Sequence, residues 1–134
     1  MLREYLIQLC KELAIATPPK LNEQKIYPFR LGKDLLSLKD LDPGVAMQAQ
    51  ICPCPNKKKE DIFIYLMRAN LLGQGTGNAR IGLDHEEKFL TLSLGLPYEM
   101  NYQIFRDSIE EFVNYLIFWR DSVTKFENEE SIYN

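Results

Sequence analysis

Three glycines, Gly73, Gly75 and Gly77, fall within one short stretch, a density that is typical of loops that wrap a phosphate. A dinucleotide fingerprint needs G-x-G-x-x-G after a strand and before a helix, whereas a P-loop ends in Gly-Lys-Ser/Thr. Neither pattern is met. The third glycine position is filled by Asn78 or by Arg80, and the stretch contains no lysine.

The position of this glycine stretch also disfavours phosphate binding. Both motifs present the amide groups of a helix N-terminus to the anion, but here the apolar pattern predicts a helix that ends before the glycines and a strand that begins after them. The negative end of the helix dipole would face the phosphate. We therefore interpret Gly73 as a helix C-cap and the 73–77 loop as a tight reversal. A nucleotide-binding domain remains the less favoured alternative.

The cysteines and the single histidine are the other candidates for chemistry. Cys52 and Cys54 supply two thiolates at i and i+2, which is half of a tetrahedral zinc site, and Cys10 and His85 lie far away in sequence. His85 stands in a polar turn, whereas a catalytic histidine needs a pocket. We expect no catalytic residue, no metal and no cofactor, so the chain is not expected to be an enzyme.

Composition describes an ordinary globular domain. The 134 residues suit one domain, and 46% of them are hydrophobic. A net charge of -3 disfavours nucleic acid as a partner, and the basic run 57–59 is followed directly by Glu60 and Asp61. No apolar run reaches the ~18–20 residues that span a bilayer. Without a recognisable secretory signal, the three cysteines suit a reducing cytoplasm.

The elements that must position these residues follow from apolar periodicity. Helical spacing predicts three helices and alternation predicts five strands. The expected helices cover about 2–15, 57–72 (capped by Asn56) and 101–123; the expected strands cover 27–31, 36–39, 45–51, 78–84 and 89–94. The order α-β-β-β-α-β-β-α with short turns predicts an α+β fold with a mostly antiparallel five-stranded sheet. Pro28 marks its strand as an edge.

We expect a single domain over 1–123 and a frayed acidic tail over 124–134. The predicted second and last helices carry apolar residues on more than one side, and the first strands add Tyr27 and Phe29. A one-layer sheet with three helices is not expected to bury all of them. The surplus indicates either a generous core or, as the favoured interpretation, apolar surface that is kept for a partner chain.

The segment LMRANLLGQGTGNARIGLDHEEKFLTLSLGLP, residues 66–97, resembles the signature region of class I type III secretion chaperones, the Tir-chaperone-like family. An apolar helix ends in Ala-Asn-Leu-Leu, and a loop of small residues, a strand ending in Gly-Leu-Asp and a strand ending in Leu-Pro follow. A last helix with an aromatic near its end, FVNYLIFWRD, completes the pattern. The resemblance covers about residues 2–122.

This resemblance implies a bacterial cytoplasmic dimer without enzymatic activity. Such a chaperone holds the N-terminal region of a secreted effector in extended form and keeps it soluble and competent for secretion. A homodimer is expected, and a heterodimer with a related chaperone stays open. The alternative function is that of a regulatory adaptor that sequesters other proteins.

The resemblance also implies site residues. The expected effector-binding residues, in the first helix and first strands, are Leu2, Leu6, Leu9, Tyr27, Phe29, Leu36 and Leu38. The expected dimer-interface residues, in the second helix and the adjoining strand, are Ile62, Tyr65, Leu66, Ala69, Leu72, Ala79 and Ile81. Charged residues in place of Leu6 and Phe29 are expected to weaken effector binding and to leave the fold intact.

Overall fold

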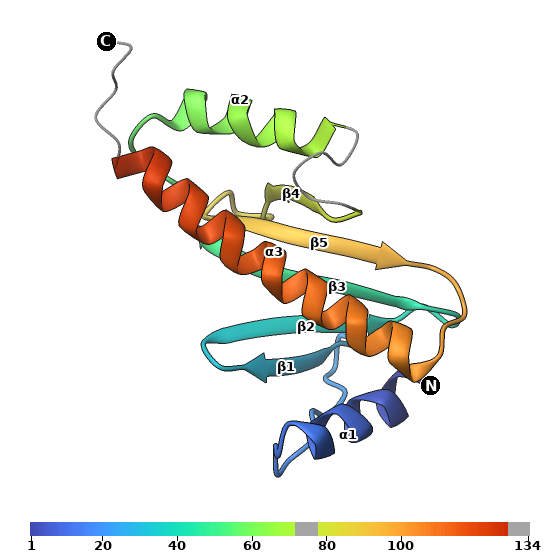
Figure 1. Ribbon diagram of the computed structural model, residues 1–134. Helices are drawn as coiled ribbons and strands as arrows, with labels where there is room; N and C mark the ends of the chain where they lie inside the picture. The colour runs from blue at the N-terminus through green and yellow to red at the C-terminus, as the bar shows by residue number, and fades with distance from the viewer. Residues whose placement is uncertain (72–77, 129–134) are drawn as a thin grey trace.

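The computed structural model describes residues 1–71 and 78–128 of the chain (Figure 1). Its elements follow the predicted order, and the α+β class is confirmed. The helices are α1 (Leu2–Glu12), α2 (Lys59–Asn70) and α3 (Tyr102–Asn128), and the strands are β1 (Tyr27–Leu31), β2 (Asp34–Asp40), β3 (Val45–Pro53), β4 (Arg80–Leu83) and β5 (Phe89–Leu96).

The five strands form one antiparallel sheet in the order β1-β2-β3-β5-β4. Strand β1, which contains Pro28, lies at an edge as predicted, because proline has no amide hydrogen to donate to a second neighbour. One row of paired residues crosses the whole sheet: Phe29, Leu36, Ala49, Leu92 and Ile81. All five are buried, so this row defines the inner face of the sheet.

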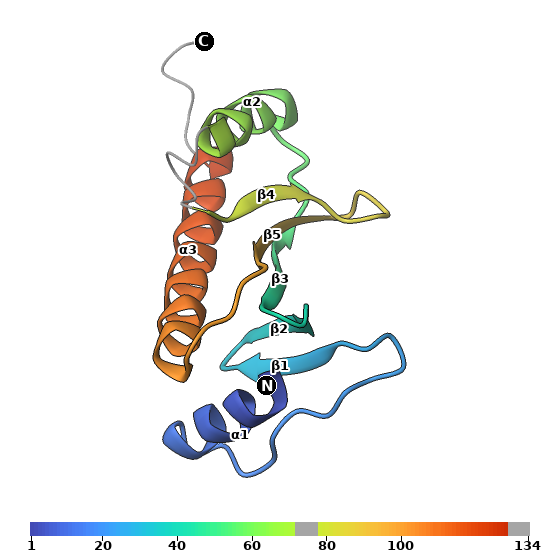
Figure 2. The same ribbon diagram turned by 90° about the vertical axis from the view of Figure 1, so that its right-hand side faces the viewer.

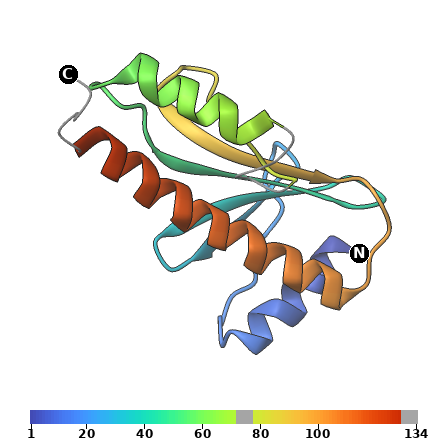
Figure 3. The ribbon, with the colours of Figure 1, turned by 45° about the horizontal axis from the view of Figure 1, so that its top comes forward.

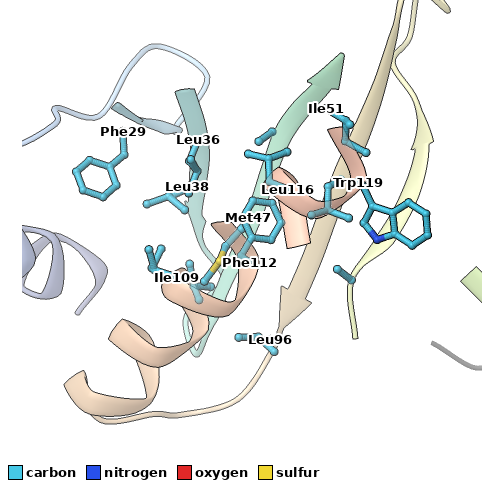
Figure 4. Close-up of a cluster of buried hydrophobic side chains, with 14 of the residues drawn as sticks. Phe29, Leu36, Leu38, Met47, Ile51, Leu96, Ile109, Phe112, Leu116 and Trp119 are labelled. Atoms are coloured by element: carbon cyan, nitrogen blue, oxygen red, sulfur yellow. The ribbon is translucent and has the colours of Figure 1, made fainter. Parts of the chain in front are cut away.

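Helix α3 lies across that inner face and closes the core (Figures 1 and 4). Its buried side chains recur every three or four residues, which places them on one side of the helix. They are Phe105, Ile109, Phe112, Leu116, Trp119 and Val123. Helix α1 packs beyond the β1 edge and against the start of α3, where the Tyr5 hydroxyl donates a hydrogen bond to the Met100 carbonyl at 2.7 Å.

Arg120 joins α3 to the sheet at a β-bulge. The register of β3 against β5 shifts between Gln50 and Cys52, which frees the Ile51 carbonyl from the ladder. The guanidinium Nε donates to that carbonyl at 2.8 Å, and Nη2 donates to Asp34 Oδ1 at 2.6 Å. The Asp34 side chain is only 12% exposed, so the Arg120 guanidinium neutralises a carboxylate that has little contact with solvent.

Four predicted helix ends differ from the structure by two or more residues. Helix α1 ends at Glu12 instead of residue 15. The residue that precedes α2 is Lys58, with φ 56° and no side-chain cap, so the prediction of Asn56 as the cap is wrong. Helix α2 ends at Asn70 instead of residue 72 and its C-cap is Leu71, so the prediction of Gly73 as the C-cap is also wrong. Helix α3 runs to Asn128 and takes in residues 124–128 of the expected tail. The Phe126 ring stacks on the Tyr65 ring of α2, with 5.3 Å between the ring centroids, so the last turns of α3 pack against α2.

Candidate partner-binding surfaces

Helix α2 presents two apolar sides, and only one of them faces the core. It lies along the β4 edge of the sheet (Figures 1 and 3). Ile62, Leu66 and Ala69 point inward and are buried. On the outer side, Ile64, Met67 and the C-cap Leu71 are 50%, 70% and 62% exposed. Residues spaced by three and four share one face of a helix, so these three form an uncovered apolar stripe, which we call the outer α2 stripe.

A groove of about 260 Å³ runs between α2 and β4, beside the outer α2 stripe. Its lining is almost entirely apolar. The residues are Phe63, Leu66, Met67, Asn70, Ile81, Gly82, Leu83 and Leu90. Leu83, on the other bank from Met67, is 42% exposed. Groove and stripe together make a continuous apolar surface of the kind that marks a protein contact.

Asn70 fastens α2 to the free edge of β4. Its Nδ2 donates to the Ile81 carbonyl at 2.8 Å, and its Oδ1 accepts from the Ile81 amide at 2.8 Å. The carboxamide thereby pairs with both backbone groups of one residue, as a neighbouring strand would. The free backbone groups of an edge strand can pair with another strand. The N–H and C=O groups of Ile81 are already bonded to Asn70, so a partner at this groove would bind through side chains.

Replacing Asn70 with alanine is expected to lower the free energy of unfolding by about 1–3 kcal/mol, because both Ile81 groups lose their partner beside the buried core. Asn70→Asp keeps the acceptor but sets a carboxylate oxygen against the Ile81 carbonyl, so it should be no more stable than Asn70→Ala. Urea denaturation followed by Trp119 fluorescence measures the loss, and faster exchange of the Ile81 amide locates it. Unchanged stability and exchange in both variants would contradict this role.

The expected interface residues lie mostly inside the protomer. Ile62, Leu66, Ala69, Ala79 and Ile81 are at most 9% exposed. Tyr65 is half-buried between Trp119 and Phe126, and Leu72 lies outside the described residues. A dimer role for this set stays a prediction. The accessible apolar residues of the same two elements are the outer α2 stripe and Leu83, which sequence reasoning did not select. The sequence feature that could have identified the outer α2 stripe was the second apolar side of the predicted 57–72 helix.

The expected effector-binding residues are also largely internal. Leu2, Leu6, Leu9, Phe29, Leu36 and Leu38 are at most 4% exposed, and Tyr27 is half-buried. Leu6 and Phe29 belong to the central core, with Phe29 shown in Figure 4 beside Leu36 and Leu38. The expectation that charged residues at Leu6 and Phe29 would leave the fold intact is therefore wrong, since an unpaired charge in the core is strongly destabilising.

The residues considered for chemistry remain dispersed. Burial raises the pKa of Cys10, and burial also raises that of Cys52 against the opposing charge of Arg120; a protonated thiol is a poor nucleophile. His85 is exposed in the β4–β5 turn. Within residues 1–71 and 78–128, no group of three or more His, Cys, Asp or Glu side chains could hold a metal ion. The glycines at 73, 75 and 77 lie outside the described residues.

No helix in the described part of the chain is both long enough and apolar enough to cross a bilayer.

Comparison with known proteins gives a consistent family match. The model of the Tir chaperone protein (CesT) family matches residues 5–120. No curated protein sequence matches at a significant level.

Similar solved structures share the fold. The ExsC-ExsE complex is 12% identical with a TM-score of 0.72, over 90% of this chain and 91% of that one. The HopA1-SchA chaperone-effector complex is 11% identical with a TM-score of 0.66, over 90% and 93%. The Yersinia pestis type III secretion chaperone SycH, in complex with a stable fragment of YscM2, is 14% identical with a TM-score of 0.64, over 88% and 98%.

Proposed function

This chain belongs to the Tir chaperone protein (CesT) family, and from that premise we propose that it is a bacterial cytoplasmic type III secretion chaperone. It binds the N-terminal region of a secreted effector in extended form and keeps that region soluble and competent for secretion. The observation that carries the proposal is the family match over residues 5–120, and the partly accessible apolar residues on the α1 and β1 side give an extended chain a place to bind. One of the structures that share its fold is described as a chaperone-effector complex.

The outer α2 stripe and the adjoining groove are the proposed dimer interface. Two copies related by a twofold axis would present the same patch to each other. Met67, at 70% exposure, projects from the bank of its own groove, so its flexible side chain is placed to enter the groove of the partner. A homodimer is the proposed state. A related chaperone with a similar α2 face would give a heterodimer by the same contacts.

The effector is proposed to lie on the α1 and β1 side of the protomer. The six internal residues of the predicted set form the floor beneath this surface, and Tyr27 is the member that an extended chain reaches directly. Half-buried neighbours Ile7, Ile15 and Leu31 add apolar contact area. Backbone pairing to the free edge of β1 is a further mode, but Pro28 offers no amide donor there.

The chain is proposed to act by binding instead of catalysis. A regulatory adaptor that sequesters a non-secreted protein would use the same surfaces, and the identity of the bound protein separates the two functions. The nucleotide-binding alternative rests on residues 73–77. Saturable binding of ATP or a dinucleotide that Gly75→Val abolishes would favour it over the chaperone function.

Co-expression with candidate secreted proteins tests the proposal. We expect a stable soluble complex in which an N-terminal segment of the effector is protected from proteolysis. Tyr27→Asp should weaken the complex about tenfold or more, because it sets a charge in an apolar contact. The matched control is Tyr98→Asp, which changes an exposed tyrosine at 47% exposure after β5. Failure of every secreted candidate to be bound or solubilised would overturn the proposal.

A further inference from the structure

One face of the sheet carries no helix. Helix α3 covers the opposite face, and α1 and α2 lie beyond the two edges (Figures 1 and 2). Side chains alternate between the two faces of a strand, so the residues between the core positions point to this uncovered face. They are Arg30, Leu35, Ser37, Lys39, Ala46, Gln48, Gln50, Arg80, Thr91 and Ser93.

Two hollows on this face adjoin each other. One, of about 630 Å³, is lined by residues that include Arg30, Lys33 and Gln48, and it begins at the Arg120–Asp34 pair. The other, of about 390 Å³, reaches Lys39 and Arg80. Ser37 and Gln48 line both hollows. They form one depression across the strands, which we call the sheet trough.

The sheet trough is cationic although the whole chain has a net charge of -3. Of its two acidic side chains, Asp34 is paired with Arg120, whereas Asp84 Oδ1 accepts the backbone amides of Lys88 and Phe89 and keeps its negative charge. In the part of the chain that is described, ion pairs join Lys88 to Glu86, Arg106 to Glu12 and Arg120 to Asp34.

Arg30, Lys33 and Lys39 take part in none of these ion pairs and are exposed. Arg80 also lines the trough while one of its Nη atoms donates to the Ala79 carbonyl. The lining of the two hollows contains five basic side chains, Arg30, Lys33, Lys39, Arg80 and Arg120, and two acidic ones, Asp34 and Asp84. Basic groups therefore outnumber acidic groups from the β1–β2 turn to β4.

The rest of the lining mixes polar and apolar residues. Gln48, Gln50 and Ser93 are exposed and offer amide and hydroxyl groups, which can pair with the free backbone of an unfolded chain. Apolar side chains also line both hollows: Leu35, Ile51 and Phe89 are among those of the larger one, and Ile26, Met47 and Leu94 are among those of the smaller one. Such a surface suits an extended chain with carboxylates, because cationic, amide and apolar groups lie side by side along it.

We propose that the sheet trough binds an acidic, extended polypeptide segment of the effector, as a second contact distinct from the apolar surfaces. The inference rests on the proposed function, in which the effector is held unfolded. Five strands about 4.8 Å apart span about 19 Å, which about six extended residues cross. A few carboxylates in that length suffice to meet Arg30, Lys33 and Lys39.

Two other occupants fit the trough less well. A second copy of this chain in a twofold contact would set Arg30 and Lys39 against the same residues of its partner, and like charges repel. A nucleic acid would meet a protein of net charge -3 with few basic groups, whereas phosphate backbones need many.

The test measures fluorescence anisotropy of labelled peptides at low and high salt. An acidic Glu-Ser repeat of about twelve residues, long enough to cross the sheet, is compared with a Lys-Ser repeat and with a DNA oligonucleotide of similar charge. We expect the acidic peptide to bind, the basic one not to bind, and salt to weaken the binding. Arg30→Glu with Lys39→Glu should weaken it about tenfold or more.

The matched control reverses two charges outside the trough, Lys57→Glu with Lys59→Glu, and should change peptide binding less than about twofold. Equal loss in this control, equal binding of both peptides, or tighter binding of the oligonucleotide would overturn the inference. The same variants are then assayed with a co-expressed effector. If the complex forms and the Arg30→Glu with Lys39→Glu variant binds as tightly as the unmodified protein, the trough inference fails while the proposed function stands. If no complex forms with any effector, the proposed function itself fails.

Discussion

Met67→Glu is expected to convert the dimer to a monomer and to leave the protomer folded. Met67 is 70% exposed in the protomer, so its replacement removes little from the core. In the proposed dimer it lies at the centre of the apolar contact, where a carboxylate would be desolvated without a partner. A residue in that position is worth about 2 kcal/mol or more, so the dissociation constant should rise about 30-fold or more.

Light scattering and sedimentation across micromolar concentrations measure this change. The matched control is Ile104→Glu, which sets the same charge on an exposed apolar residue of α3, at 43% exposure, away from α2. It should remain dimeric. Circular dichroism establishes that both variants are folded. A dimeric Met67→Glu protein would refute the proposed interface, and a monomeric unmodified protein would refute the dimer itself.

Gly44→Ala is expected to be the most destabilising of the small substitutions. Gly44 lies in the β2–β3 turn with φ at 101°, a conformation that L side chains rarely adopt. An added Cβ would lie 2.7 Å from the Tyr98 amide nitrogen and 2.9 Å from the Pro97 Cα, and closer still to the Leu96 carbonyl oxygen. These are backbone atoms at the end of β5 and in the segment that joins it to α3. They cannot rotate away, so we expect a loss of about 3 kcal/mol or more in the free energy of unfolding.

Two other glycines, Gly32 in the β1–β2 turn and Gly95 in β5, provide graded controls. Gly32 also has a positive φ, of 60°, but nothing lies within 4 Å of an added Cβ, so Gly32→Ala should cost about 1 kcal/mol from backbone strain alone. Gly95 has open space and no positive φ, and its alanine variant should be close to neutral. Urea denaturation of the three variants measures the order. A Gly44→Ala protein as stable as the Gly95→Ala protein would contradict the close approach.

The element order was predictable because apolar periodicity is a local property. The spacing of Phe105, Ile109 and Phe112 marks a helix, and the alternation from Val45 to Ile51 marks a strand, whatever the rest of the chain does. Pro28 placed β1 at an edge for a reason that is also local. Helix ends were less predictable. The last turns of α3 are held by Phe126 against Tyr65, a contact between residues far apart in sequence.

The sequence predicted which helices and strands carry the candidate surfaces, but it did not predict which of their side chains are accessible. The sequence pointed to α1, β1, β2, α2 and β4, and within them to the most regular apolar stripes. Those stripes, with Leu6 and Leu66 as examples, are buried in the protomer, because the protomer's own core takes the most apolar face of each element. The accessible apolar residues, such as Ile64 and Met67, are the ones off the main stripe.

The sequence by itself determined the α+β class, the antiparallel sheet and the family resemblance, since each depends on residues close together in the chain. Only the tertiary structure decided which side of α2 stays uncovered, that Asn70 occupies the β4 edge at Ile81, and that Arg30, Lys39 and Arg80 line one face of the sheet. Strand order and register bring these groups together. Such pairing depends on contacts across the whole chain, which no local period encodes.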